Sequence, residues 1–328
     1  MRHDIITIGG VTEDIMFHTG EAQIIKNPKK TGSRYLFAFE AGGKILADQE
    51  VLYTGGGGGA NTAISFSRLG LKTALVASIG RDLSGQRLFT RLKKEKVNLN
   101  NLQILDKRWT GISFIITAGK RNERIIFTDR AANDQFKINK AIFRKLKAGW
   151  YYLTSLSGDH WRDNLDFIFQ TAQKKKTPVA WNPGSLQLKA GLNFLKKYLK
   201  QTEVLILNKE EAMELAGSKR KNVKAEVLFK DLSKLGPKII SITDGVKGAY
   251  VYQNNEQLFA KAIGNKPVNK TGAGDAFGSS LVGGFILYND LERALRLAII
   301  RSGFVVMKIG AQEGLLTRSQ AEDKFNLA

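Results

Sequence analysis

The sequence predicts an α/β protein with a doubly wound, mostly parallel sheet, helices on both faces, and a small β-sheet lid. Three observations lead to this prediction. Buried strand-like runs alternate with helical segments through the second half of the chain, which is typical of parallel pairing. Strand-rich material interrupts that pattern twice in the first half, over about 12–54 and 108–132. Glycine-rich stretches follow several strands, where open α/β sheets bind their ligands.

The first half opens with a short apolar run, "DIITIGG" (4–10), which predicts a buried strand ending in glycines. Strand-like stretches at 34–40 and 44–54 flank "AGGK" and predict a hairpin. A second hairpin is predicted from "GISFIITAG" and "ERIIFTDR", joined by the charged turn "KRN" at 120–122. Three further elements are expected between the two hairpins: a glycine loop feeding a helix that ends at Gly70 (55–70), a buried strand (72–80) and an amphipathic helix (83–97).

The second half is more regular. Helical segments such as 160–175 and 222–235 separate four predicted strands, and two helices close the chain. Because there is no internal repeat or low-complexity linker, we expect residues 1–328 to form a single domain, with the two early interruptions combining into the lid. The strands are expected in "WYYLTS", "TPVAWN", "EVLILN" and "KIISIT", and the last helical stripe runs from Leu291 to Ile309.

Composition excludes several classes of protein. The chain has no cysteine, which rules out disulfides, thiolate zinc sites and a cysteine nucleophile. No apolar run reaches the roughly 20 residues of a membrane span, and the start of the chain runs directly into a strand rather than a signal peptide. We therefore expect a soluble, cytoplasmic protein without a membrane partner.

The charge is strongly positive, with 51 Lys and Arg against 30 Asp and Glu, a net charge of +21. Such a chain attracts anions, including nucleic acids. The basic residues are scattered, however, and the sequence contains no recognition-helix, zinc-finger or aromatic-basic RNA motif. We expect no specific nucleic-acid partner, only non-specific, salt-sensitive adhesion.

Polar or glycine-rich features follow five of the predicted strands, and parallel topology would bring them to one edge of the sheet. Each alone has a structural interpretation: a turn or cap, a flexible loop, a capping box, a hairpin turn and an N-cap. Together they favour a functional site. They are Asp14, Asn61 after "GGGGGA", Asn208 with Glu211, "TDGVKG" (243–248) and "TGAGD" (271–275).

These motifs resemble those of the PfkB (ribokinase-like) family of carbohydrate and nucleoside kinases. The resemblance covers nearly the whole chain: "GGANTA" at 58–63, "GRDLSG" at 80–85, "NKEE" at 208–211, "TGAGDAF" at 271–277 and "KIGAQEG" at 308–314. It implies a Rossmann-like domain with a β lid and ATP-dependent phosphorylation of a hydroxyl group on a small sugar. In some members the lid also forms a homodimer surface, which is an expectation here.

The resemblance assigns the reaction centre to the last motif. Asp275 looks like the catalytic base, ionised at neutral pH because a free Asp has a pKa near 3.9. Backbone N–H groups at a helix start bind anions well, so the amides of Gly272, Ala273 and Gly274 would stabilise the transferring phosphoryl group.

The remaining roles also follow from the family. Mg²⁺ would bridge the nucleotide phosphates, positioned by Asn208 and Glu211. Asp14 and Asn61 would bind sugar hydroxyls, because a carboxylate accepts hydrogen bonds and an amide both donates and accepts. Gly57 and Gly58 would let the sugar ring lie close to the backbone. The expected ATP-binding residues are Asn208, Thr243, Gly245, Gly248, Thr271 and, beside adenine, Ser302.

Two residues depart from the family pattern. Asn269 stands where an acid usually helps to hold a monovalent cation, so dependence on K⁺ is in doubt. Lys270 replaces the usual small residue, and we hypothesise that it supplies positive charge beside the phosphates.

Other functions remain open. A nucleoside kinase phosphorylating a ribose 5′-hydroxyl would share every motif, with Phe17, Tyr35, Phe37 or Phe39 stacking on the base. A non-catalytic sugar- or nucleotide-binding module would not require Asp275. A Rossmann dehydrogenase is disfavoured, since "GGVTED" lacks the G-x-G-x-x-G fingerprint.

Overall fold

The computed structural model describes residues 2–28, 35–119, 123–218, 223–264 and 267–327. A nine-stranded sheet runs through the body of the molecule in the order β15-β14-β13-β12-β11-β10-β1-β6-β7. Seven neighbouring strands, from β13 to β7, pair in parallel, and β14 and β15 add an antiparallel edge. The strands are β1 (Arg2–Ile8), β6 (Thr73–Gly80), β7 (Asn98–Leu105), β10 (Lys147–Leu153), β11 (Val179–Trp181), β12 (Val204–Asn208), β13 (Ile239–Thr243), β14 (Ala249–Gln253) and β15 (Glu256–Ala260).

Helices cover both faces of this sheet, which confirms the doubly wound α/β prediction. One hydrophobic core packs α3 to α8 against the strands, and the others pack α1, α2, α9 and α10. The helices are α1 (Gly58–Arg68), α2 (Leu83–Lys94), α3 (Lys140–Lys145), α4 (Trp161–Lys175), α5 (Ser185–Lys189), α6 (Leu192–Leu199), α7 (Lys209–Leu215), α8 (Ala225–Ser233), α9 (Ala273–Tyr288), α10 (Leu291–Val305) and α11 (Arg318–Glu322), with short 3₁₀ segments η1 (Ala131–Gln135), η2 (Gly245–Lys247) and η3 (Phe325–Leu327).

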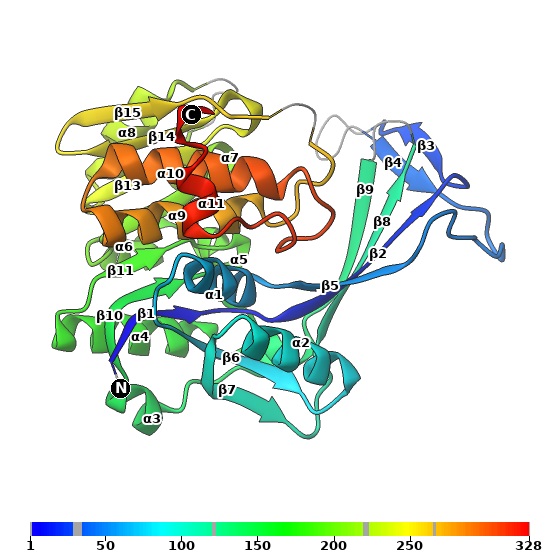
Figure 1. Cartoon of the computed structure of the whole chain (residues 1–328), viewed down its shortest axis with the longest axis horizontal. Coiled ribbons are helices and arrows are strands. Elements are labelled where there is room, and N and C mark those ends of the chain that lie inside the picture. Colours follow the sequence, from blue (N-terminus) through cyan, green and yellow to red (C-terminus); the bar gives the residue numbers. More distant parts are fainter. Residues whose placement is uncertain (1, 29–34, 120–122, 219–222, 265–266, 328) are drawn as a thin grey trace.

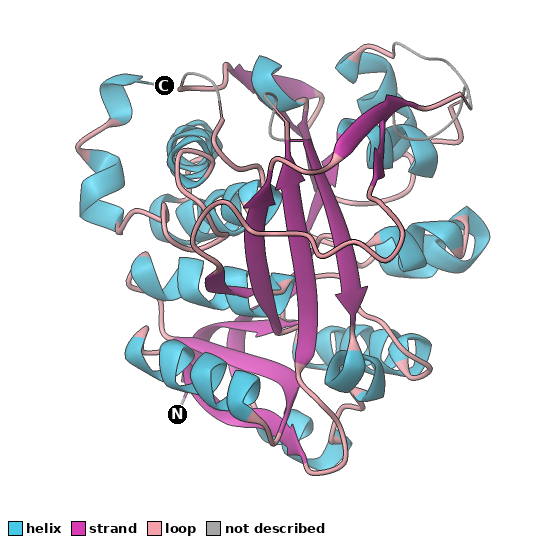
Figure 2. Ribbon diagram, turned by 90° about the vertical axis from the view of Figure 1, so that its right-hand side faces the viewer, coloured by secondary structure: helices cyan, strands magenta, loops and turns pink. Residues whose placement is uncertain are grey.

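A small sheet of order β5-β2-β8-β9 projects from the carboxyl ends of the parallel strands (Figure 1). It is nearest the viewer in Figure 2. Its strands come from the two regions that the sequence singled out, and the two regions meet through a parallel pairing of β2 with β8. The strands are β2 (Thr12–Thr19), β5 (Leu52–Gly56), β8 (Gly111–Ala118) and β9 (Glu123–Asp129).

One predicted hairpin is wrong. A turn does form at 40–43, where the Gly43 amide donates to the Glu40 carbonyl. However, β4 (Tyr35–Ala38) pairs with β3 (Gln23–Lys26), and β5 pairs with β2. The hairpin of β8 and β9 is confirmed, while its charged turn at 120–122 lies outside the described residues. Local turn signals identify a reversal of the chain but not which strands will pair.

Two polar side chains tie the small sheet to the body. Asn133 of η1 accepts from the Val11 amide at 2.9 Å and donates to the Val11 carbonyl at 2.8 Å. Asp82 caps α2 through the Gly85 amide and also accepts from the amide and hydroxyl of Thr110, just before β8. Because each anchor joins segments far apart in sequence, the small sheet is held at a defined place over the strand ends.

The last predicted helix ends earlier than its apolar stripe suggests, and a short helix that was not predicted, α11, follows it. Helix α10 stops at Val305, and the chain then turns at Gly310, whose φ of +99° favours glycine. This turn brings residues 311–315 back toward α1, where Ala311 and Gln312 are buried. No helix in the described ranges is both long and apolar enough to cross a bilayer.

Candidate active site

The first turn of α9 forms the centre of the site. Gly272 is the N-cap with a left-handed φ of 78°, and a Cβ there would lie 2.5 Å from Ala311 Cβ. In the described part of the chain, the amides of Gly272, Gly274 and Asp275 donate to no protein acceptor, and the Ala273 amide makes only a 3.5 Å bond to the Lys270 carbonyl. A helix start with unused donors is a natural anion site.

Asp275 is not the N-cap of this helix. It stands in the first turn, and its Oδ2 accepts a 2.8 Å hydrogen bond from Asn61 Nδ2 on α1. Burial raises the pKa of Asp275, and the hydrogen bond from Asn61 opposes this rise. The carboxyl is therefore a stronger base than the free side chain that the sequence suggested, while Asn61 favours its ionised form.

Asp14 lies on β2, inside the small sheet rather than in a loop after β1. It is 6% exposed, and a Cβ on Gly56 would lie 2.4 Å from its Oδ2, so glycine is needed there. Burial raises the pKa of Asp14 to about 6; a hydrogen bond from Ser113 and the charge of Arg124 lower it, and the nearby charge of Asp275 raises it. Asp14 and Asp275 are therefore close enough for their charges to interact.

The glycines before α1 are used for close packing rather than flexibility. A Cβ on Gly57, whose φ is +86°, would lie 2.5 Å from the Gly10 carbonyl, and one on Gly58 would lie 3.0 Å from Thr154. The loop can therefore press against the end of β1. Asn61 lies among the buried residues in the first turn of α1 and is 4% exposed.

Two of the residues expected at the nucleotide are adjacent in space. Asn208 and Thr243 are register partners at the ends of β12 and β13. Asn208 and Glu211 form a reciprocal capping box at the start of α7, with bonds of 2.8 and 2.9 Å. This is the structural interpretation of the pair. The capping box occupies the side-chain oxygen of Asn208 and the Oε2 atom of Glu211. The other carboxylate oxygen of Glu211 has no hydrogen bond within the described ranges.

Three other expected nucleotide residues differ in their surroundings. Gly245 has a φ of +55° and open space around it, whereas a Cβ on Gly248 would meet the Ala260 carbonyl at 2.1 Å. Glycine is thus required at 248 because the turn between β13 and β14 lies against the end of β15. Ser302 donates to the Ala298 carbonyl of its own helix at 2.7 Å, so only its acceptor capacity remains.

Sequence reasoning missed Arg124. This residue was placed in the second strand of the predicted hairpin without a functional role. It lies on β9, and its Nη1 donates to Thr271 Oγ1 at 2.7 Å. Burial lowers the pKa of Arg124, and Asp14 opposes that shift. Lys270, by contrast, is exposed. Arg124 therefore brings a cation of the small sheet to the residue that precedes the N-cap of α9.

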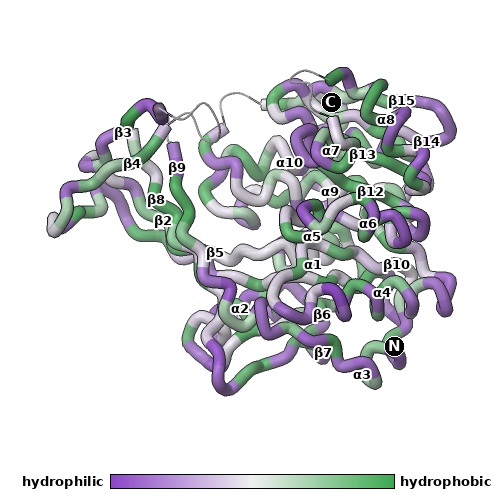
Figure 3. The backbone as a smooth tube through the Cα atoms, turned by 180° about the vertical axis from the view of Figure 1, so that it is seen from behind, coloured by the Kyte–Doolittle hydropathy of each residue, from purple (hydrophilic) through white to green (hydrophobic). Residues whose placement is uncertain are grey.

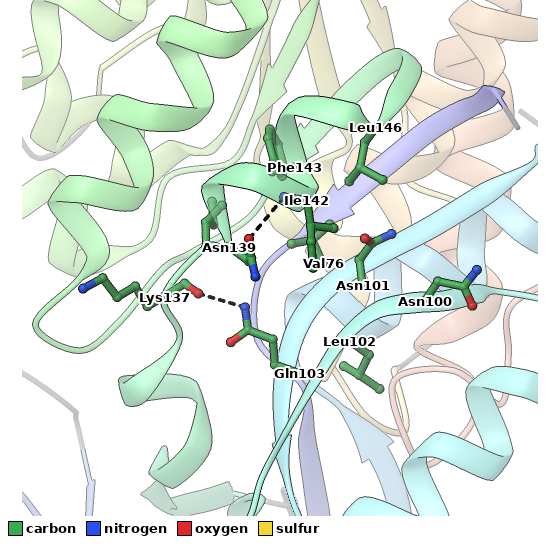
Figure 4. A pocket seen from close by; sticks show the side chains of 11 residues that line it. Val76, Asn100, Asn101, Leu102, Gln103, Lys137, Asn139, Ile142, Phe143 and Leu146 are labelled. Atoms are coloured by element: carbon green, nitrogen blue, oxygen red, sulfur yellow. Dashed lines mark hydrogen bonds between the residues drawn. The ribbon is translucent and has the colours of Figure 1, made fainter.

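A separate cavity of about 380 Å³ lies between β7 and α3 (Figure 4). Amide side chains and apolar residues line it, and its hydrogen bonds, such as Gln103 Nε2 to the Lys137 carbonyl at 2.8 Å, are local. None of the expected site residues borders it. The candidate active site lies instead where Asp14 of β2 approaches Asp275 in the first turn of α9.

The comparisons with known proteins agree with this geometry. The model of the pfkB family of carbohydrate kinases matches residues 31–318. The chain belongs to the PfkB family of carbohydrate kinases. The resemblance seen in the motifs is confirmed, and membership assigns the chain an ATP-dependent phosphotransferase activity with a hydroxyl acceptor.

Individual relatives are distant but similar over nearly their whole length. A ribokinase of Haemophilus influenzae is 26% identical over 294 residues, which is 86% of this chain and 90% of that protein. The structure of Arabidopsis thaliana ribokinase complexed with ribose and ATP has a TM-score of 0.79 at 20% identity, covering 100% of both chains. A nucleoside kinase of Burkholderia thailandensis, in complex with inosine, has a TM-score of 0.78 at 17% identity, covering 98% and 97%.

Proposed function

We propose that the chain transfers the γ-phosphoryl group of ATP to a hydroxyl of a small sugar, with Asp275 as the base. The observation that carries this proposal is the first turn of α9, where unused backbone amides stand beside a carboxylate of raised pKa. Phosphoryl transfer requires such an arrangement, because charge must be stabilised while the acceptor hydroxyl loses its proton.

The other expected residues fit around this centre. Asp14 and the remaining N–H of Asn61 would hold the acceptor, and Thr243, Gly245 and Thr271 would lie along the nucleotide. Mg²⁺ prefers oxygen ligands and keeps several waters, so the unused oxygen of Glu211 suits a hydrated ion held mainly by phosphates. The ion would neutralise phosphate charge.

A panel of sugars, sugar phosphates and nucleosides tests the proposal through ATP consumption and product mass. We expect turnover with a small sugar. Turnover with nucleosides alone would replace the sugar acceptor while keeping the chemistry, and binding without turnover would favour a non-catalytic module. Phe17 is on the opposite face of β2 from Asp14, since side chains alternate along a strand, so it cannot stack on a base in this site.

Acceptor binding should depend on pH through Asp14. Below its pKa of about 6 the carboxyl is protonated and loses acceptor capacity. We therefore expect the acceptor KM to rise about tenfold from pH 7 to pH 5. In Asp14→Asn the KM should be high and flat over this range, whereas Asp48→Asn, which alters an exposed acid paired with His18, should follow the wild type. A wild-type KM that stays constant would contradict the assignment.

Because Asn269 replaces the acid that usually helps to hold K⁺, the positive charge of that ion is in doubt. Arg124 should provide positive charge in its place. The Asn269 side chain is neutral and accepts from the Thr271 amide at 2.7 Å, while Arg124 binds the hydroxyl of the same residue. We propose that the reaction does not depend on K⁺ and that Arg124→Gln lowers kcat about 100-fold. Rates in K⁺ and Na⁺ buffers, with the exposed Arg108→Gln as control, check this. Strong K⁺ activation of the wild type would refute it.

We also propose that the outer face of the small sheet forms a homodimer. Tyr53, Phe114 and Phe127 lie on the face opposite Asp14 and are 59%, 46% and 52% exposed. Figure 3 shows the apolar character of β8 and β9. Exposed apolar surface of this kind marks interaction sites. Light scattering should give twice the chain mass, and a monomer at micromolar concentration would exclude the dimer.

A further inference from the structure

Gln312 connects the surface of the protein to Asn61. It is 1% exposed and lies in the turn after α10. Its Oε1 accepts from Arg91 Nε of α2 at 2.6 Å, and its Nε2 donates to Asn61 Oδ1 at 2.8 Å. Asn61 Nδ2 then donates to Asp275 Oδ2 at 2.8 Å. Four side chains from four separate segments thus form one continuous chain of hydrogen bonds.

The chemistry of Arg91 determines the direction of every bond in this chain. A guanidinium only donates, so Gln312 must present its carbonyl oxygen to Arg91 and its NH₂ to Asn61. Asn61 must then accept through Oδ1 and present its own NH₂ to Asp275. The amide orientations therefore follow from the partners and not from the placement of atoms that look alike.

We propose that Arg91 and Gln312 are positioning residues of a hydrogen-bond relay that keeps the Asn61 amide donating to Asp275. The proposal rests on the proposed function for the role of Asp275 as base. A donor at this point stabilises the ionised carboxylate, which burial disfavours. The relay thereby keeps the base ready to accept a proton.

The surroundings of Gln312 are built to hold it. A Cβ on Gly55 would lie 2.7 Å from Gln312 Oε1, so only glycine leaves room for the side chain. Arg68 Nη1 donates to the carbonyls of Gln312 and Leu315 at 2.9 and 2.7 Å, which fixes the loop backbone. Arg91 is further held by Glu313 at 2.6 Å. Arg68 therefore supports the loop without entering the chain of side chains.

The other charged or titratable groups near Asp275 remain the same when the relay is cut. They are Asp14 of β2, Arg124 of β9, Tyr152 of β10, whose buried hydroxyl stays neutral because its pKa is raised well above 10, and Arg301 of α10 behind α9. A change in the titration of Asp275 in Gln312→Met, which adds no charge, can then be assigned to the relay.

The test is the titration of the Asp275 carboxyl by ¹³C NMR in the full chain with labelled aspartate, assigned by its loss in Asp275→Asn. Gln312→Met removes the donor to Asn61 and should raise the Asp275 pKa by about one unit. Gln312→Glu is closer in size to Gln but offers Asn61 only an acceptor. It turns the Asn61 carbonyl toward Asp275 and should raise the pKa further.

The order of the two variants separates a relay from simple packing. Packing alone predicts that Met is more disruptive than Glu, whereas the relay predicts the reverse. Gln312→Glu also adds a carboxylate, and the part of its pKa shift that persists in an Asn61→Ala background is the direct effect of that charge. In an Asn61→Ala background Gln312→Met should cause no additional shift, because the relay acts only through Asn61. Arg68→Met, which loosens the loop without breaking the side-chain bonds, should leave the Asp275 pKa unchanged.

An unchanged pKa in both Gln312 variants, or an equal shift in Arg68→Met, would overturn the relay. The acid limb of the pH profile of kcat should shift to higher pH together with the pKa of Asp275, and KM should change little. Because NMR needs no substrate, a shifted pKa without turnover on any acceptor would overturn the proposed function and leave the relay standing.

Discussion

Asp275→Asn is expected to lower kcat by a factor of about 10²–10⁴, the usual contribution of a general base. The substitution keeps the shape of the side chain and an oxygen that can accept from Asn61 Nδ2. It removes the group that takes the acceptor proton. KM values for ATP and acceptor should change little, since neither ligand depends on the proton transfer for binding.

The stability of this variant gives an independent check. Burial raises the pKa of Asp275, so the folded protein favours the uncharged side chain, and at neutral pH the ionised carboxyl is a destabilising feature of the native state. The Tm of Asp275→Asn should equal or exceed that of the wild type. Its loss of activity would then not reflect unfolding.

The matched control is Asp290→Asn, which alters the N-cap of the next helix. Asp290 accepts from the amides of Glu292 and Arg293, and Asn caps a helix about as well as Asp. Steady-state kinetics of this variant should match the wild type. If Asp275→Asn kept more than a tenth of the wild-type kcat, Asp275 would not be the base.

Gly272→Ala should nearly abolish turnover and also destabilise the protein. The left-handed backbone at φ 78° costs a residue with a Cβ about 1–2 kcal/mol. The added methyl group would also lie 2.5 Å from Ala311 Cβ and 2.7 Å from its Cα, so the start of α9 or the loop at 311 must move. Displacing the free amides should lower kcat by about 10²–10³-fold.

Gly274→Ala separates the effect of backbone strain and steric overlap at Gly272 from the effect of merely replacing a glycine in this turn. Its Cβ would meet nothing within 4 Å, and the residue lies in the first turn of the helix with an ordinary φ. Tm should be unchanged or slightly higher, because Ala is the better helix former. Measuring the Tm and kcat of Gly272→Ala and Gly274→Ala tests both expectations. A Gly272→Ala protein with wild-type kcat would remove these amides from the reaction.

The local elements were largely predictable. The helix after "GGGGGAN", the buried strand at 73–80 and the helix of "TGAGDAF" depend on turn residues and hydrophobic periodicity within a short window, which the sequence states directly. Asp14, Asn61 and Asp275 were singled out on the expectation that parallel strands place their carboxyl ends on one edge, although Asp14 lies within β2 and Asp275 follows the antiparallel edge strand β15. Family motifs then supplied the chemistry.

Pairing and contacts between distant segments were not predictable in the same way. The turn at 40–43 exists, yet β4 pairs with the short, exposed β3, which carries almost no strand signal. Arg124 was one charged residue of a predicted strand, and Gln312 was one residue of a family motif, and neither had a predicted role. Each acts through a partner more than 140 positions away, and no local pattern encodes such a partner.

By itself, the sequence determined the α/β class and the glycine turns, because these depend on residue type and short-range spacing, and its motifs pointed to Asp14 and Asp275. Only the tertiary structure decided that Asn61 donates to Asp275, that Gln312 and Arg91 set the direction of that bond, and that a small-sheet arginine reaches Thr271. These hydrogen bonds join side chains that are distant in sequence, and such side chains meet only after the strands and helices have packed.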